Sequence, residues 1–100
     1  ADLGVMQFLG CMSEEVIVPA ISACVIDKSI PLDKAALVGC GVMTGVGAAI
    51  NTARVTPGSS VAVFGCGGVG LSIIQGARLA GAAKIIAVAR KRASPEASAA

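Results

Sequence analysis

The sequence predicts an α/β fold built on a strand–turn–helix–strand unit, and three observations support this prediction. An apolar run at residues 61–64 leads into a glycine-rich turn at residues 65–70. Residues 71–80 repeat their apolar side chains at helical spacing, which is typical of an amphipathic helix. A second apolar run follows at residues 84–88. Two strands joined through a helix are expected to lie parallel, so the sequence predicts a βαβ unit.

The glycine-rich turn has the spacing G-x-G-x-x-G, with Gly65, Gly67 and Gly70 at the fixed positions. Gly65 allows a tight turn, Gly67 allows a pyrophosphate to approach the backbone, and Gly70 allows the helix to pack on the strand. The helix that follows the turn directs its first unpaired amides at an anion, and Gly68 is also expected to contact the cofactor. The context predicts a partial Rossmann unit that binds a dinucleotide, and a turn whose glycines serve packing alone is the alternative.

The segments on either side of this unit have a different character. Residues 8–18, which end before Pro19, and residues 23–27 are expected to form strands of a separate, β-rich unit. The basic cluster at residues 90–92 is expected to be a solvated loop, and Ser94 with Pro95 to begin another helix. A parallel sheet of two strands lacks cover, so further strands are expected downstream.

Two helices are expected between the β-rich segment and the βαβ unit. The first is expected to begin with Ser29 as its cap and Pro31 near its first position, and to end at Gly39. The second has an apolar stripe that runs from residue 42 to residue 53. The helix of the βαβ unit is expected to end at Gly81.

Composition excludes several classes of function. The 100 residues carry a net charge of only +2, and the aromatic residues are two Phe, so an aromatic nucleic-acid platform is not expected. Residues 55–77 carry no charge and are numerous enough to suggest a membrane-spanning helix, but Pro57-Gly58 and the glycine cluster interrupt them. We therefore expect no membrane partner. The sequence begins without Met and shows no secretory signal, which favours a fragment of a cytoplasmic protein.

The four cysteines are Cys11, Cys24, Cys40 and Cys66, and there is no His. None of them forms a C-x-x-C pair, so a self-contained zinc site is not expected. A disulfide framework is also not expected in so apolar a chain. From the residues alone, each cysteine is interpreted as a buried small hydrophobe in a reducing compartment.

Residues 39–49 and 61–71 resemble the zinc-dependent medium-chain alcohol dehydrogenases, as do residues 16–19 and 31–37. The resemblance covers about residues 8–88 and is closest to the branch that includes the thiol-dependent formaldehyde dehydrogenases. It implies that residues 1–40 are the C-terminal end of a GroES-like catalytic domain. It also implies that residues 41–100 begin the Rossmann domain.

The function that the resemblance implies is reversible hydride transfer between a small alcohol or aldehyde and NAD, with zinc as Lewis acid. The full-length protein is expected to be a homo-oligomer, and the fragment alone is expected to be inactive. A nucleotide-binding remnant that does not assemble the zinc site is the alternative.

The resemblance also assigns roles to single residues. Cys40 falls on the third ligand of the catalytic zinc, and the other ligands are expected outside this chain. Thr44 falls where a hydroxyl lies beside the nicotinamide, and Val69 falls where a side chain backs the ring. Without the resemblance, Cys40 is interpreted as a buried thiol, Thr44 as an ordinary residue at a helix start, and Val69 as core.

The sequence departs from the pattern at Ala89, where an NAD-type site carries an acid about 20 residues after the turn. Ala89 has no acceptor, and Arg90 follows it. A small residue followed by arginine accommodates a 2′-phosphate, so NADP with Arg90 as a clamp is the alternative to NAD.

Overall fold

The computed structural model describes residues 10–90, which divide into two compact units on either side of the Ile30–Pro31 bond. Within the described part of the first unit, the regular element is the short 3₁₀ helix η2 (Ala20–Ser22). The strands predicted at residues 8–18 and 23–27 do not form over residues 10–27, so that prediction is wrong there. The reason is that a strand is stabilised by pairing, and neither segment has a partner strand among residues 10–90.

The second unit begins with one continuous helical segment, Leu32–Thr52. It comprises α1 (Leu32–Leu37), η3 (Val38–Val42), α2 (Met43–Gly47) and η4 (Ala48–Thr52), where η3 and η4 are π-type turns. The predicted helix end at Gly39 is wrong, because Gly39 keeps a negative φ and the helix passes through it. The domain boundary expected at residues 40–41 lies inside this helix and stays a prediction.

The residues before this helix also differ from the prediction. The Ser29 amide and hydroxyl both donate to Asp27 Oδ1, at 2.8 and 2.6 Å, and Ser29 is not the helix cap. Pro31 takes the cap position, without a side-chain hydrogen bond, and Asp33 lies in the first turn. The Asp27 carboxylate closes a local turn with Ser29, two residues later, and this turn occupies the Ser29 hydroxyl that a helix cap would use.

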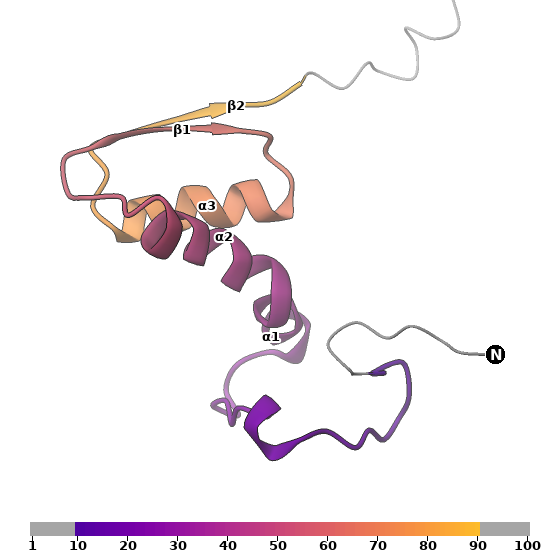
Figure 1. Ribbon diagram of the computed structural model, residues 1–100. Coiled ribbons are helices and arrows are strands. Elements are labelled where there is room, and N and C mark those ends of the chain that lie inside the picture. Colours follow the sequence, from indigo (N-terminus) through magenta and orange to yellow (C-terminus); the bar gives the residue numbers. More distant parts are fainter. Residues whose placement is uncertain (1–9, 91–100) are drawn as a thin grey trace, which may run out of the picture. The chain divides into compact units, whose positions relative to one another are not determined.

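The βαβ prediction is confirmed. β1 (Ser60–Phe64), α3 (Gly68–Leu79) and β2 (Lys84–Val88) follow one another, and the strands pair in parallel from Ser60 with Lys84 to Phe64 with Val88 (Figure 1). The predicted cap at Gly81 is also confirmed. Gly81 has φ +84°, its amide donates to the Arg78 carbonyl at 3.0 Å, and the Ala82 amide donates to the Ala77 carbonyl at 3.0 Å. These bonds satisfy the carbonyls left free at the end of α3.

The core lies where α3 packs against α2 on one side and the sheet on the other (Figure 1). Ala49, Val63 and Ala77 are almost completely buried. Two glycines bring the helices close together: a Cβ on Gly45 would lie 2.6 Å from the Val69 carbonyl oxygen, and one on Gly76 would lie 2.9 Å from Val46 Cα. Backbone therefore packs on backbone, which explains the excess of small residues.

The other face of the sheet is apolar and uncovered by the described residues. Figure 1 shows α2 and α3 on one side of β1 and β2. Phe64 is 80% exposed, and Ile86 and Val88, which lie at positions that alternate with the inward-facing Val63 and Ile85, are also exposed. Because parallel sheets are normally covered on both faces, this layer has the character of part of a larger α/β domain.

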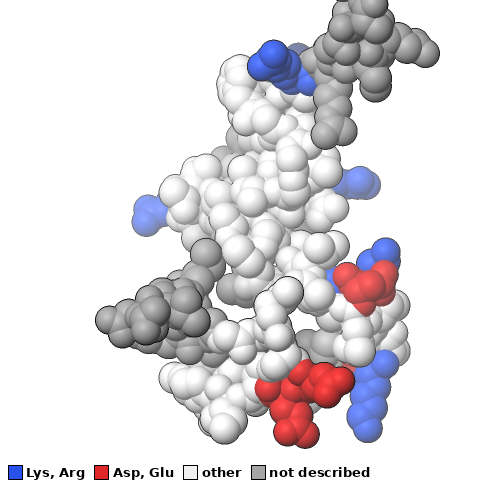
Figure 2. Space-filling view, turned by 90° about the vertical axis from the view of Figure 1, so that its right-hand side faces the viewer, with Lys and Arg blue, Asp and Glu red and all other residues white. Residues whose placement is uncertain are grey.

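Charged side chains are few on the face that Figure 2 shows, and most of that surface is uncharged. The segment Leu32–Thr52 is long and apolar enough to cross a membrane by length and composition, but packed helices meet the same criteria. Residues 55–77, whose length and lack of charge suggested a membrane-spanning helix, instead form a turn, β1 and most of α3. The charged cluster beyond Arg90 and the helix predicted near Ser94 lie outside the described residues.

Candidate dinucleotide site and metal ligand

The turn between β1 and α3 has the geometry that the glycine spacing predicts. Gly65 has φ +95°, a left-handed conformation that suits glycine, and it reverses the chain at the end of β1. An added Cβ on Gly70 would collide with the Gly65 carbonyl oxygen, so the turn and the helix require glycine at both positions. A Cβ on Gly67 would meet no protein atom within 4 Å, which leaves the space outside Gly67 open.

The N-terminus of α3 carries no side-chain cap. Gly67, the N-cap residue, has extended backbone at φ −79° and ψ −168°, and no acidic side chain lies in the first turn. The first backbone bond of the helix runs from the Leu71 amide to the Gly67 carbonyl at 2.9 Å. The amides of Gly68, Val69 and Gly70 therefore precede the helical bonding pattern, and together with the helix dipole they suit an anion.

The end of β2 lies directly beside this turn. The Gly65 amide donates to the Val88 carbonyl at 2.8 Å, and Cys66 Sγ lies 3.8 Å from the same oxygen. Parallel pairing places the carboxyl ends of both strands at one edge, where ligands of open α/β sheets bind. Ala89 and Arg90 are both exposed and leave β2 at this edge.

A hollow of about 380 Å³ lies between the long helix and the first turns of α3. The long helix contributes Gly41 and Val42, and α3 contributes Gly68 and Gln75. Its lining is mainly apolar, with Gln75 and Ser72 as the polar side chains, and the Ser72 hydroxyl already donates to the Gly68 carbonyl at 2.9 Å. The structure therefore brings the segment that follows Cys40 against the beginning of the glycine-turn helix.

Cys40 and Thr44 lie one turn apart on the long helix, and both are exposed. Neither side chain lines the hollow, although Gly41 and Val42 between them do. Val69 is 41% exposed in the first turn of α3, so its side chain is available at the surface of the glycine-turn region. The roles that the resemblance implies for these three residues stay predictions.

Cys40 carries a sulfur atom, which is the group through which cysteine binds zinc. Within residues 10–90 no three His, Cys, Asp or Glu side chains lie close enough together to hold a metal ion. A catalytic zinc takes three protein ligands, so the described residues do not form that site by themselves. All four cysteines are free, and Cys11, Cys24 and Cys40 are exposed while Cys66 is half-buried. The expectation of buried thiols is therefore wrong for three of them, because so small a unit has little interior.

Sequence reasoning missed the close helix contacts at Gly45 and Gly76, and the buried Ser72 that lies against Gly45. It also missed Gln75 in the hollow. Small residues four apart at Gly45 and Ala49 are a signal that the helix packs closely on a neighbour, and this signal was available. Gln75 has no sequence signal of its own, because its position depends on how the two helices cross.

Known proteins resemble this chain over most of its length. S-(hydroxymethyl)glutathione dehydrogenase of Saccharomyces cerevisiae is 57% identical over 86 residues, which is 84% of this chain and 22% of the relative. Alcohol dehydrogenase 6 of Rattus norvegicus is 59% identical over 80 residues, which is 80% of this chain and 21% of the relative. No protein-family profile matches the chain.

Solved structures that resemble this chain also carry the name alcohol dehydrogenase. Benzyl alcohol dehydrogenase from Acinetobacter calcoaceticus matches 62% of this chain and 17% of its own, at a TM-score of 0.59 and 45% identity. An alcohol dehydrogenase zinc-binding domain protein from Burkholderia ambifaria matches 74% of this chain and 19% of its own, at 0.61 and 46% identity. The chain thus spans about a fifth of the length of its relatives, and its similarity to them indicates the alcohol dehydrogenase family.

Proposed function

We propose that the chain forms the dinucleotide-binding start of an NAD(P)-dependent zinc alcohol dehydrogenase, an oxidoreductase that transfers hydride between an alcohol or aldehyde and the cofactor. The observation that carries the proposal is the turn at residues 65–70. It combines the left-handed Gly65, the obligatory glycine at residue 70 and an uncapped helix N-terminus at the carboxyl edge of a parallel sheet. This combination suits a diphosphate.

Each residue has a limited role in this proposal. The amides of Gly68 and Val69 bind the diphosphate, and the open space beside Gly67 admits it. The Thr44 hydroxyl is proposed to lie beside the nicotinamide, and the Val69 side chain to pack against the ring. When bound, the dinucleotide supplies the hydride chemistry, while the chain supplies position and charge.

Cys40 is proposed to supply one thiolate to a catalytic zinc whose other protein ligands lie outside the described residues. Zinc in such a site acts as a Lewis acid toward the substrate oxygen. The described residues do not complete the ligand set, so the proposed role of Cys40 is binding only. A small alcohol or aldehyde substrate, a cytoplasmic location and a homo-oligomeric whole protein are parts of the same proposal.

Titration of the 100-residue chain with ADP-ribose, followed by calorimetry, tests the proposal. Gly67→Ala is expected to weaken binding at least about tenfold, because the added methyl group occupies the space that the diphosphate needs, and tenfold corresponds to 1.4 kcal/mol. The free energy of unfolding is expected to change little, since that methyl meets no protein atom. Equal ADP-ribose affinity in both proteins would contradict the proposal.

A second candidate function is nucleotide binding without catalysis. The lack of a three-ligand metal cluster among residues 10–90 agrees with this candidate, and it agrees equally with an enzyme whose other ligands lie outside these residues. Zinc content separates the two candidates. In a longer protein that also carries the remaining ligands, the enzyme is expected to contain about one zinc for each Cys40. A remnant is expected to bind ADP-ribose and to contain no zinc.

A further inference from the structure

The position that normally decides between the two nicotinamide dinucleotides lies at the end of β2. Val88 is the last residue of that strand, and its carbonyl accepts a hydrogen bond from the Gly65 amide at 2.8 Å. Ala89 and Arg90 therefore follow a residue that touches the glycine turn itself. In a dinucleotide-binding βαβ unit, an acid at this position binds the ribose diol.

No carboxylate of the βαβ unit is available for that task. Residues 35–90 contain no Asp or Glu, whereas they contain the cationic residues Arg54, Arg78, Lys84 and Arg90. The nearest acid before this stretch, Asp33, lies 3.2 Å from Lys34 at the beginning of the long helix. An adenosine ribose with a free 2′-hydroxyl would thus meet Ala89, which offers no side-chain acceptor, where a diol needs one.

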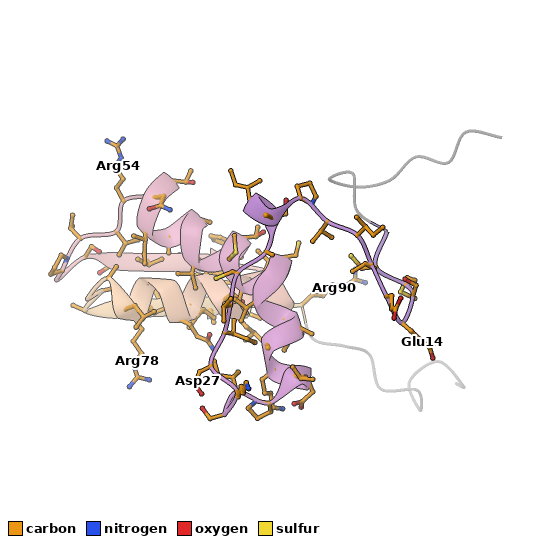
Figure 3. All side chains as sticks on the ribbon, turned by 90° about the horizontal axis from the view of Figure 1, so that it is seen from below. Glu14, Asp27, Arg54, Arg78 and Arg90 are labelled. Carbon is orange, nitrogen blue, oxygen red and sulfur yellow. The ribbon has the colours of Figure 1, made fainter. Side chains whose placement is uncertain are left out.

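Arg90 brings the opposite chemistry to the same edge. Its side chain is exposed, and within the described part of the chain it forms no ion pair. Figure 3 shows Arg90 at the end of the sheet where α3 begins, whereas Arg54 and Arg78 lie at the opposite end. A guanidinium is planar and binds phosphate oxygens in a bidentate manner, and it gains more from a phosphate than from a hydroxyl.

We propose that Arg90, with Ala89 leaving room beside it, binds a 2′-phosphate on the adenosine ribose, so that the chain prefers the NADP type of dinucleotide. This inference rests on the proposed function, because it requires the diphosphate to lie on the glycine turn. It goes beyond that function by fixing which of the two dinucleotides the edge of the sheet selects.

Adenosine 2′,5′-bisphosphate and 5′-AMP are suitable probes, since they differ only in the 2′-phosphate. Calorimetry on the 100-residue chain at about 0.15 M salt is expected to give at least about tenfold tighter binding of the bisphosphate, in line with charge-assisted bonds. Arg90→Ala is expected to abolish this preference and to leave 5′-AMP binding unchanged. Ala89→Asp is expected to reverse the preference, because the new carboxylate repels the phosphate and accepts from the diol.

Arg78→Ala is the matched control, because it removes the same charge at the opposite end of the sheet and is expected to preserve the preference (Figure 3). Equal affinity for both probes in the unaltered chain, or equal losses in Arg78→Ala and Arg90→Ala, would overturn the inference and leave the proposed function standing. Failure of both probes to bind would overturn both.

Discussion

Replacing Gly45 by alanine is expected to destabilise the second unit, because this glycine is where the long helix and α3 touch through their backbones. The added Cβ would lie 2.6 Å from the Val69 carbonyl oxygen and 2.8 Å from the Ile73 amide nitrogen, and it would collide with Ser72 Cβ. Two of these three atoms belong to the backbone of α3, so a side-chain rotation does not relieve the contact. The helices must separate, which costs about 1–3 kcal/mol for an overpacked core.

Gly47→Ala is the matched control in the same helix. Its added Cβ would meet one atom within 4 Å, the Asn51 Nδ2 at 3.8 Å, which is an ordinary contact. Both substitutions gain about 0.5–1 kcal/mol of helix propensity, so the difference between them isolates the steric cost. We therefore expect Gly47→Ala to be slightly stabilising and Gly45→Ala to be less stable than it by about 1–3 kcal/mol.

The assay is urea unfolding of the 100-residue chain, followed by far-ultraviolet circular dichroism, with the slope compared between variants. A lower midpoint at unchanged slope reports lost stability rather than a changed unfolded state. If Gly45→Ala and Gly47→Ala unfolded at the same urea concentration, the close contact between the helices would be refuted.

Three further predictions concern other parts of the chain. Gly81→Ala is expected to cost about 1–2 kcal/mol in urea unfolding, because residue 81 has φ +84°, and an unchanged midpoint would contradict the left-handed cap. Hydrogen bonds from the Ser29 hydroxyl and then the Ser29 amide lower the pKa of the Asp27 carboxyl below its usual 3.8. The stabilisation that these bonds give is therefore fully present above pH 3.8, and it is lost as the pH falls through the lowered pKa. An NMR titration checks this, and Ser29→Ala is expected to raise the Asp27 pKa; an unchanged value would refute the bond. After dialysis the chain is expected to retain less than one zinc, because Cys40 is one ligand of several, and stoichiometric zinc would contradict that assignment.

The βαβ unit could be predicted from the sequence because its signals are local. Apolar runs, glycine spacing and the helical repeat all lie within residues 61–88, and the structure confirms the strands, the helix between them and the cap at Gly81. Even the two strands, which pair from Ser60 with Lys84, belong to this one short stretch, so little tertiary context is needed.

The segments before this unit could not be predicted in the same way. The alternating residues before Pro19 suit a strand, but a strand also requires a partner, and none is present among the described residues. Gly39 suits a helix end, yet the helix continues because the residues after it pack on α3. Tertiary contacts decided both outcomes, and the sequence pattern does not contain them.

The glycine turn of the candidate site was predictable from the sequence, whereas the surroundings of Cys40 and Thr44 were not. The glycines of the turn could be assigned physical roles from spacing alone, and the left-handed Gly65 and the crowded Gly70 agree with those roles. The roles of Cys40 and Thr44 depend on groups outside residues 10–90 and stay predictions.

The central claim is that the backbone after β1 binds a diphosphate, and amide chemical shifts report on it directly. Titration of the ¹⁵N-labelled chain with ADP-ribose is expected to produce saturable shifts at the amides of Gly67, Gly68 and Val69, and to leave the amides near Arg54 and Arg78 unmoved. The same titration of Gly67→Ala is expected to require a much higher ligand concentration. Saturable shifts confined to any other region, or no shifts at all, would contradict the account.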